Sequence, residues 1–134
     1  MFGDIWKIAH YPPAGTVIWV RAYLVFKHRG IVTDSWLGGK PVVITNSPSD
    51  GVIEQSWDEF SSGQTPMVED DFLPTLPVRE VIARARSLLG RTYDVLGFNC
   101  DHFVNFAHGK PVTSYQLLAA VGIAALALFV AGRR

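Results

Sequence analysis

The chain has 134 residues, 49% of them hydrophobic, and its 12 basic and 12 acidic residues cancel at neutral pH. This length favours one domain with a sizeable core, and the balanced charge argues against electrostatic capture of nucleic acid. One cysteine and four scattered histidines lack the spacing of a zinc site, so no metal is expected.

The N-terminal segment shows no basic region followed by an apolar run, so a secretory signal is not expected. A free thiol without such a signal fits a reducing compartment. We therefore expect the folded domain to lie in the cytoplasm.

The first half of the sequence is typical of β-structure. Its apolar runs are rich in β-branched and aromatic residues and are separated by turn signals. The polar stretch 61–75 contains a glycine and two prolines and predicts a loop. Strands are expected at residues 16–21, 23–26, 30–33, 41–45 and 52–56.

Two helices are expected in the second half. Apolar residues recur at helical spacing after Pro77 and predict a helix over 77–90, with its arginines largely on the solvent face. Asn99 is a favoured N-cap for a second helix, which Gly109 would end. Strands followed by helices indicate an α+β domain.

The C-terminal tail is the most apolar part of the chain. Residues 117–132 carry no charge and are followed by Arg133 and Arg134. A helix of this length covers roughly 24 Å, which is short against a hydrocarbon core of about 30 Å, although local bilayer thinning would let it insert. We expect a transmembrane or membrane-anchoring helix over 115–134, following a domain over 1–114. The alternative is a core helix, but such a helix usually has a polar face.

The single cysteine, Cys100, lies where the second helix is expected to begin. It cannot form an intramolecular disulfide. At a helix start, unpaired backbone N–H groups and the helix dipole lower the pKa of a thiol, which favours a nucleophilic thiolate. The alternative is that Cys100 is a small apolar residue of the core.

A cysteine nucleophile needs a base, and His28 is the best candidate. It follows an apolar strand, which predicts a position at the edge of the sheet. His102 is a poor candidate because two residues on a helix turn the side chains about 200° apart. His10 and His108 have no supporting context and are expected at the surface.

The sequence around the cysteine, Asn99-Cys100-Asp101-His102-Phe103-Val104, resembles the cysteine signature of the lecithin:retinol acyltransferase-like family. The similarity extends over about residues 13–116, and the short loops resemble those of bacterial members. The other matching stretches, in chain order, are Pro13-Ala14-Gly15, His28-Arg29-Gly30-Ile31, Gly51-Val52-Ile53-Glu54-Gln55-Ser56 with Phe60, Arg84-Ala85-Arg86, Leu89-Gly90, Tyr93 and Ser114-Tyr115-Gln116.

The resemblance implies a permuted papain-like α+β fold and catalysis through an acyl-thioester. By this resemblance, Cys100 takes the role of the nucleophile and His28 that of the general base and acid. Members of this family take an acyl chain from a glycerophospholipid and pass it to an amine, an alcohol or water. No cofactor is implied, and hydrophobic C-terminal tails in animal members support the membrane anchor.

Two positions depart from the family pattern. Asp101 stands where a glutamate is usual. The third polar residue, usually a histidine on the strand after the histidine box, aligns with Thr45, and Asn46 is beside it. Strand alternation sends Thr45 and Asn46 to opposite faces, so either the Thr45 hydroxyl or the Asn46 amide orients the imidazole, or only a dyad is left.

We therefore predict a membrane-associated, thiol-dependent acyltransferase or phospholipase A, with phospholipid as substrate and with Cys100, His28 and Thr45 as site residues. A peptidase or amidase with the same Cys–His pair is a second hypothesis. A non-catalytic membrane-anchored module is a third, because the third histidine is missing.

Overall fold

The protein is an α+β domain, as the order of predicted elements indicates. A computed structural model of the chain describes residues 11–23, 26–69, 72, 75–111 and 114–132. Its elements, in chain order, are β1 (Val17–Tyr23), β2 (Phe26–Leu37), β3 (Lys40–Ser47), β4 (Gly51–Gln55), α2 (Trp57–Ser61), β5 (Met67–Val68), α3 (Val78–Ser87), α4 (Cys100–Ala107) and α5 (Tyr115–Ala131).

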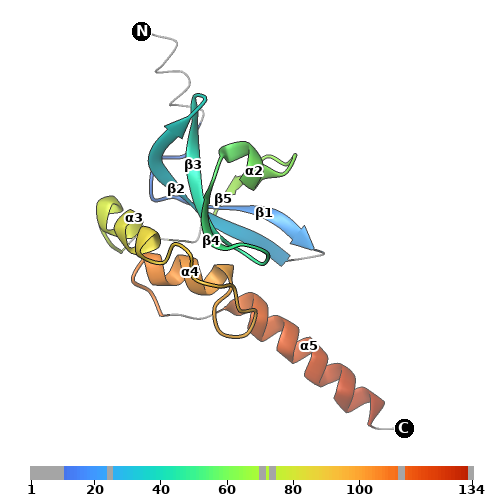
Figure 1. Cartoon of the computed structure of the whole chain (residues 1–134). Helices are drawn as coiled ribbons and strands as arrows, with labels where there is room; N and C mark the ends of the chain where they lie inside the picture. The colour runs from blue at the N-terminus through green and yellow to red at the C-terminus, as the bar shows by residue number, and fades with distance from the viewer. Residues whose placement is uncertain (1–10, 24–25, 70–71, 73–74, 112–113, 133–134) are drawn as a thin grey trace.

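The strands form one antiparallel sheet in the order β4-β3-β2-β1-β5. Figure 1 shows α3 and α4 together on one side of this sheet, α2 on the other, and α5 extending away from the domain. The twelve-residue strand β2 is central and pairs with both β1 and β3. The sheet therefore has two covered faces, built around a long central strand.

Strand alternation divides the core into two clusters. On one face, Ile31 and Ile44 are paired across β2 and β3 and pack with Phe103 and Val104 of α4. On the other face, residues from the same strands pack with Phe60 of α2. Side chains that alternate along β2 and β3 consequently reach opposite sides of the sheet.

The predicted strand over 23–26 is wrong. The chain ends β1 at Tyr23 and begins β2 at Phe26, and β2 runs without interruption to Leu37. The apolar run over 23–26 did not reveal where β1 ends and β2 begins, because it contains no turn signal. As a result His28 lies near the start of the central strand, and not at the edge of the sheet as predicted.

The predicted loop over 61–75 also needs correction. Its first residue ends α2, and Met67–Val68 forms the short strand β5 beside β1. The sequence contains a signal for α2, a serine followed three residues later by a glutamate. Ser56 accepts a hydrogen bond from the backbone of Glu59, whose carboxylate accepts one from the backbone of Ser56 in return, a capping box.

Helix α5 is apolar and exposed along its length. It covers 17 residues, and no helix in the described part of the chain is both long and apolar enough to cross a membrane. The predicted transmembrane helix is therefore not supported, because 17 residues rise only about 26 Å. The alternative of a buried core helix does not fit either, since side chains such as Leu118 and Leu128 are well exposed.

Gly51 allows the segment that leads to α4 to pass close to the start of β4. It begins β4 with φ +74°, and a Cβ there would lie 2.3 Å from the Arg91 carbonyl oxygen, which accepts the N–H of Val52. We expect Gly51→Ala to lower the free energy of unfolding by roughly 3 kcal/mol, through strain and this clash. Chemical denaturation followed by circular dichroism measures the loss.

Gly63→Ala is the matched control. Gly63 also has positive φ, +80°, but a Cβ there meets nothing within 4 Å. Its substitution should cost about 1 kcal/mol from backbone strain alone. Equal losses in the two variants would show that the close approach to Arg91 is unimportant.

Candidate active site

The start of α4 is fixed by Asn99, as predicted. Its Oδ1 accepts the backbone N–H groups of Asp101 (2.9 Å) and His102 (3.2 Å), and His102 Nδ1 accepts the N–H of Asn99 (3.0 Å). This reciprocal cap pairs the backbone donors of the first turn. Cys100 is thereby held as the first residue of the helix.

The Cys100 thiol is buried and points to strand β2. Its Sγ donates to the Lys27 carbonyl oxygen at 3.7 Å, and 7% of the residue is exposed. Burial, with a further contribution from the Asp101 carboxylate, raises the pKa of Cys100 from 9.0 to about 11. The lowered pKa predicted from the helix start is therefore wrong, because desolvation outweighs the helix terminus. The thiol is protonated at neutral pH.

His28 is oriented by Thr45. The two side chains share a hydrogen bond of 3.1 Å between His28 Nε2 and Thr45 Oγ1. The single hydroxyl proton of Thr45 is donated to the Arg29 carbonyl oxygen (2.7 Å), so Oγ1 accepts from the imidazole. Nε2 therefore carries the ring proton, and burial lowers the pKa of His28, which favours the neutral ring. Nδ1 is then the free base of this side chain.

Asn46 has a different role from Thr45, as strand alternation predicts. It is completely buried, and its Nδ2 donates to the carbonyl oxygen of Phe98 at 2.8 Å. The Asn46 side chain therefore holds the segment before α4, whereas Thr45 contacts His28. Of the two candidates for the third residue, Thr45 is the one that bonds the imidazole.

Cys100 and His28 line the same cavity, which has a volume of about 300 Å³. Tyr93 is part of the wall, and burial raises the pKa of its phenol, as do Cys100 and Asp101. The first turns of α5 contribute Gln116, Leu117 and Ala120, so the exposed apolar helix forms one side of the cavity. This arrangement suits a ligand that presents an apolar group to the wall formed by α5, close to Cys100 and His28.

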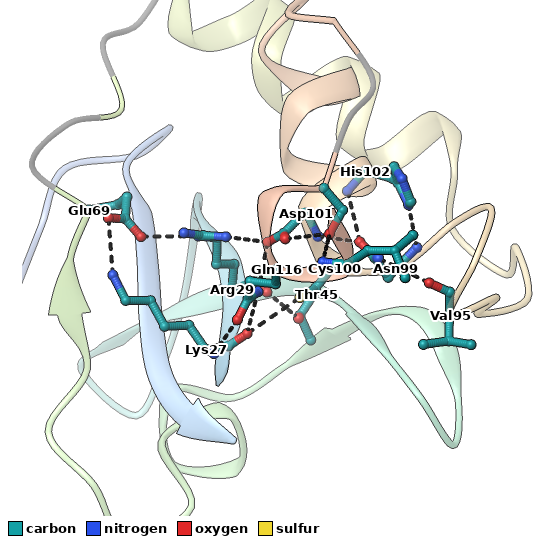
Figure 2. Close-up of polar contacts among 12 residues, drawn as sticks. Lys27, Arg29, Thr45, Glu69, Val95, Asn99, Cys100, Asp101, His102 and Gln116 are labelled. Atoms are coloured by element: carbon teal, nitrogen blue, oxygen red, sulfur yellow. Dashed lines mark hydrogen bonds and ion pairs between the residues drawn. The ribbon is translucent and has the colours of Figure 1, made fainter. Parts of the chain in front are cut away.

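A network of charged and polar side chains surrounds Cys100, and no local pattern in the sequence predicts it (Figure 2). Glu69 pairs with Lys27 and Arg29, and Arg29 pairs with the buried carboxylate of Asp101. Asp101 also accepts from the Ser114 hydroxyl (2.7 Å) and the Gln116 amide (3.0 Å). Opposite charges at positions 29 and 101 were visible in the sequence, but nothing indicated that they meet.

Residues 7–110 match the family described as lecithin retinol acyltransferase. The chain belongs to this family. A curated relative, phospholipase A and acyltransferase 1 of Rattus norvegicus, is 42% identical over 55 residues, which cover 40% of this chain and 33% of that protein. The aligned part is thus about a third of the length of the relative.

In this member of the lecithin retinol acyltransferase family, His102 and His108 have structural positions. His102 closes the cap of α4. His108 was expected at the surface, which is wrong. It is 2% exposed, and its Nε2 bonds the Gly15 carbonyl oxygen at 3.0 Å, because α4 packs its last turn against the start of the sheet. His10 lies outside the described residues.

Asp101 offers a direct test of this electrostatic environment. We expect Asp101→Asn to lower the pKa of Cys100, because it removes a nearby negative charge and leaves Arg29 less neutralised. Alkylation by iodoacetamide at pH 8 should become about tenfold faster, which corresponds to one pKa unit. The rate is measured by intact mass against pH, and the single cysteine makes the reading unambiguous.

Asp58→Asn is the control for this experiment. Asp58 is an exposed carboxylate of α2 that pairs with Lys40. It should leave the alkylation profile unchanged. An unchanged or raised pKa in a folded Asp101→Asn protein would mean that the carboxylate does not act on the thiol.

Proposed function

We propose that this protein is a thiol-dependent acyltransferase or phospholipase A that acts on acyl esters of glycerophospholipids, with an acyl-thioester on Cys100. The observation that carries the proposal is the position of Cys100 and His28 on one cavity, with His28 held by Thr45. We further propose that the strand carrying the base and the helix carrying the nucleophile correspond to a permuted papain-like fold.

The comparisons support the chemical class. The family is that of lecithin retinol acyltransferase, and the name of the rat relative combines phospholipase A with acyltransferase. Both names describe transfer or hydrolysis of an acyl group. The apolar side of the cavity, formed by residues such as Leu117 and Ala120, suits an acyl chain.

The proposed reaction starts from a neutral thiol and a neutral imidazole. Cys100 Sγ attacks the ester carbonyl carbon while its proton passes to His28 Nδ1, so the thiolate forms during the attack. The tetrahedral intermediate then collapses. The ester C–O bond breaks, the acyl group stays on Sγ, and the lysophospholipid alkoxide takes the proton from His28. Water, an amine or an alcohol attacks the thioester, again with His28 as base.

The developing oxyanion requires a backbone donor near Sγ. In the first turn of α4, the N–H groups of Asp101 and His102 donate to Asn99 Oδ1, and that of Phe103 donates to Asn99 O. We assign the N–H of Cys100 itself, at the N-terminus of this eight-residue helix, as a donor to the oxyanion.

Helix α5 is the proposed contact with the lipid surface. Its residues from Leu117 to Ala131 are apolar or glycine, and those beyond Ala120 are all exposed. Since Leu117 and Ala120 also line the cavity, contact of α5 with lipid brings the cavity to the bilayer surface. This placement raises the effective concentration of a phospholipid substrate.

The missing third histidine was the main support for a non-catalytic module. Thr45 bonds the imidazole at the same point, so the orienting contact is kept by a different residue type. This contact favours the enzyme over the module.

Intact-protein mass spectrometry after incubation with phosphatidylcholine vesicles at neutral pH tests the proposal. We expect an added mass equal to one fatty acyl group, which hydroxylamine removes, because thioesters are cleaved by this nucleophile. Cys100→Ala should gain no mass. Absence of both the adduct and released lysolipid in the unmodified protein would refute the proposed substrate class.

Thr45 gives a second test of the mechanism. Thr45→Val removes the acceptor for His28 Nε2–H while keeping the shape of the side chain. We expect kcat to fall by about 100-fold or more, because the residue that orients a catalytic histidine sets its tautomer and position. Thr45→Ser, which keeps the hydroxyl, should stay within a few-fold of the unmodified protein in the same assay. Similar kcat values for the valine and serine variants would remove Thr45 from the mechanism.

A further inference from the structure

Gln116, in the first turn of α5, bonds the main chain of β2 beside His28. Its Oε1 accepts the Lys27 N–H at 2.5 Å, and its Nε2 donates to the Lys27 carbonyl oxygen at 3.0 Å. The ladder between β2 and β3 pairs Gly30 with Thr45 and has no partner for Lys27. The Gln116 amide therefore bonds Lys27 as a residue of a neighbouring strand would.

The same amide reaches the two groups that surround the thiol. The Lys27 carbonyl oxygen, which accepts from Gln116 Nε2, is also the acceptor for Cys100 Sγ at 3.7 Å. Nε2 donates in addition to Asp101 Oδ1 at 3.0 Å. Figure 2 shows Gln116 between Lys27 and Asp101, next to Cys100.

We propose that Gln116 is a positioning residue for the Cys100 thiol, acting through the Lys27 peptide and the Asp101 carboxylate. Its Nε2 protons partly neutralise two negative groups close to Cys100 Sγ, the Lys27 carbonyl oxygen and the Asp101 carboxylate. Without them the potential at Sγ becomes more negative and the thiolate is harder to form. The charged groups around this position are Lys27 and Arg29 on β2, Glu69 after β5, and Asp101 on α4, with the titratable side chains of His28, Tyr93 and Cys100 on the same cavity.

The hydrogen bonds of Gln116 also connect α5 to the site. Gln116 is two residues from Leu118, the first exposed apolar side chain of the helix. Under the proposed function, the helix that contacts lipid is therefore hydrogen-bonded to the strand of the base and to the helix of the nucleophile. The role of Gln116 in thiol reactivity does not depend on lipid contact, and it can be tested without substrate.

The test is the rate of Cys100 alkylation by iodoacetamide between pH 7 and 10, read by intact mass, in Gln116→Ala and Gln116→Glu. We expect about tenfold slower alkylation at pH 8 in Gln116→Ala, and a larger loss in Gln116→Glu, which adds a carboxylate beside Asp101. If Gln116 had a purely structural role, Gln116→Glu would lose less reactivity than Gln116→Ala. The glutamate carboxylate can still accept the Lys27 N–H, whereas alanine cannot. Leu118→Ala, an exposed position on the same helix, should match the unmodified protein.

Wild-type alkylation rates in both Gln116 variants, or a smaller effect of glutamate than of alanine, would overturn the proposal. Loss of the folded state in both variants, seen by circular dichroism, would also overturn it, since Gln116 would then hold the fold and not the thiol. Because alkylation needs no acyl donor, its outcome is independent of whether phospholipid is the substrate.

Discussion

The buried ion pair between Arg29 and Asp101 joins the central strand to the helix that carries the cysteine. Removing two charges from water is costly, and the cost is offset only if their remaining hydrogen-bonding capacity is used. Here Glu69 bonds Arg29 from the far side, and Ser114 and Gln116 bond Asp101. The segment after β5, the central strand, α4 and α5 thus meet at one pair of side chains, and these contacts hold the start of α4, where Cys100 lies.

The same burial determines the protonation state of Cys100. A thiol at a helix N-terminus is often described as activated by the helix, yet Cys100 is buried next to a carboxylate, and its proton is retained. Under the proposed mechanism, such a neutral thiol reacts only when a substrate carbonyl is in place to receive the sulfur. Such a site is less exposed to oxidation and to unwanted alkylation than one that holds a standing thiolate.

Local sequence signals predicted the parts of the structure that depend on local geometry. Asn99 was recognised as a cap because capping involves residues within one turn, and the divergence of Thr45 from Asn46 follows from the period of a strand. The family resemblance is confirmed by the match over residues 7–110. The roles of Cys100, His28 and Thr45 remain predictions.

Features that depend on distant contacts were not predictable from one sequence. The Arg29–Asp101 pair joins positions 72 residues apart, and the pKa of Cys100 depends on how completely the folded chain excludes water from it. His108 looked like a surface residue because its burial comes from Gly15, 93 positions earlier. The boundary between β1 and β2 was not predicted, because the apolar run over 23–26 contains no glycine, proline or other turn signal.

The uniform apolarity of α5 has a consequence for how the protein behaves once it is removed from the cell. This helix of 17 residues exposes large apolar side chains along most of its length, and contiguous exposed apolar surface is uncommon on soluble monomers. In dilute aqueous buffer, copies of the chain would cover this surface by associating with one another through α5. Since Leu117 and Ala120 belong to the cavity wall, such association would also obstruct the cavity. Detergent micelles or lipid nanodiscs are therefore the suitable medium for purification.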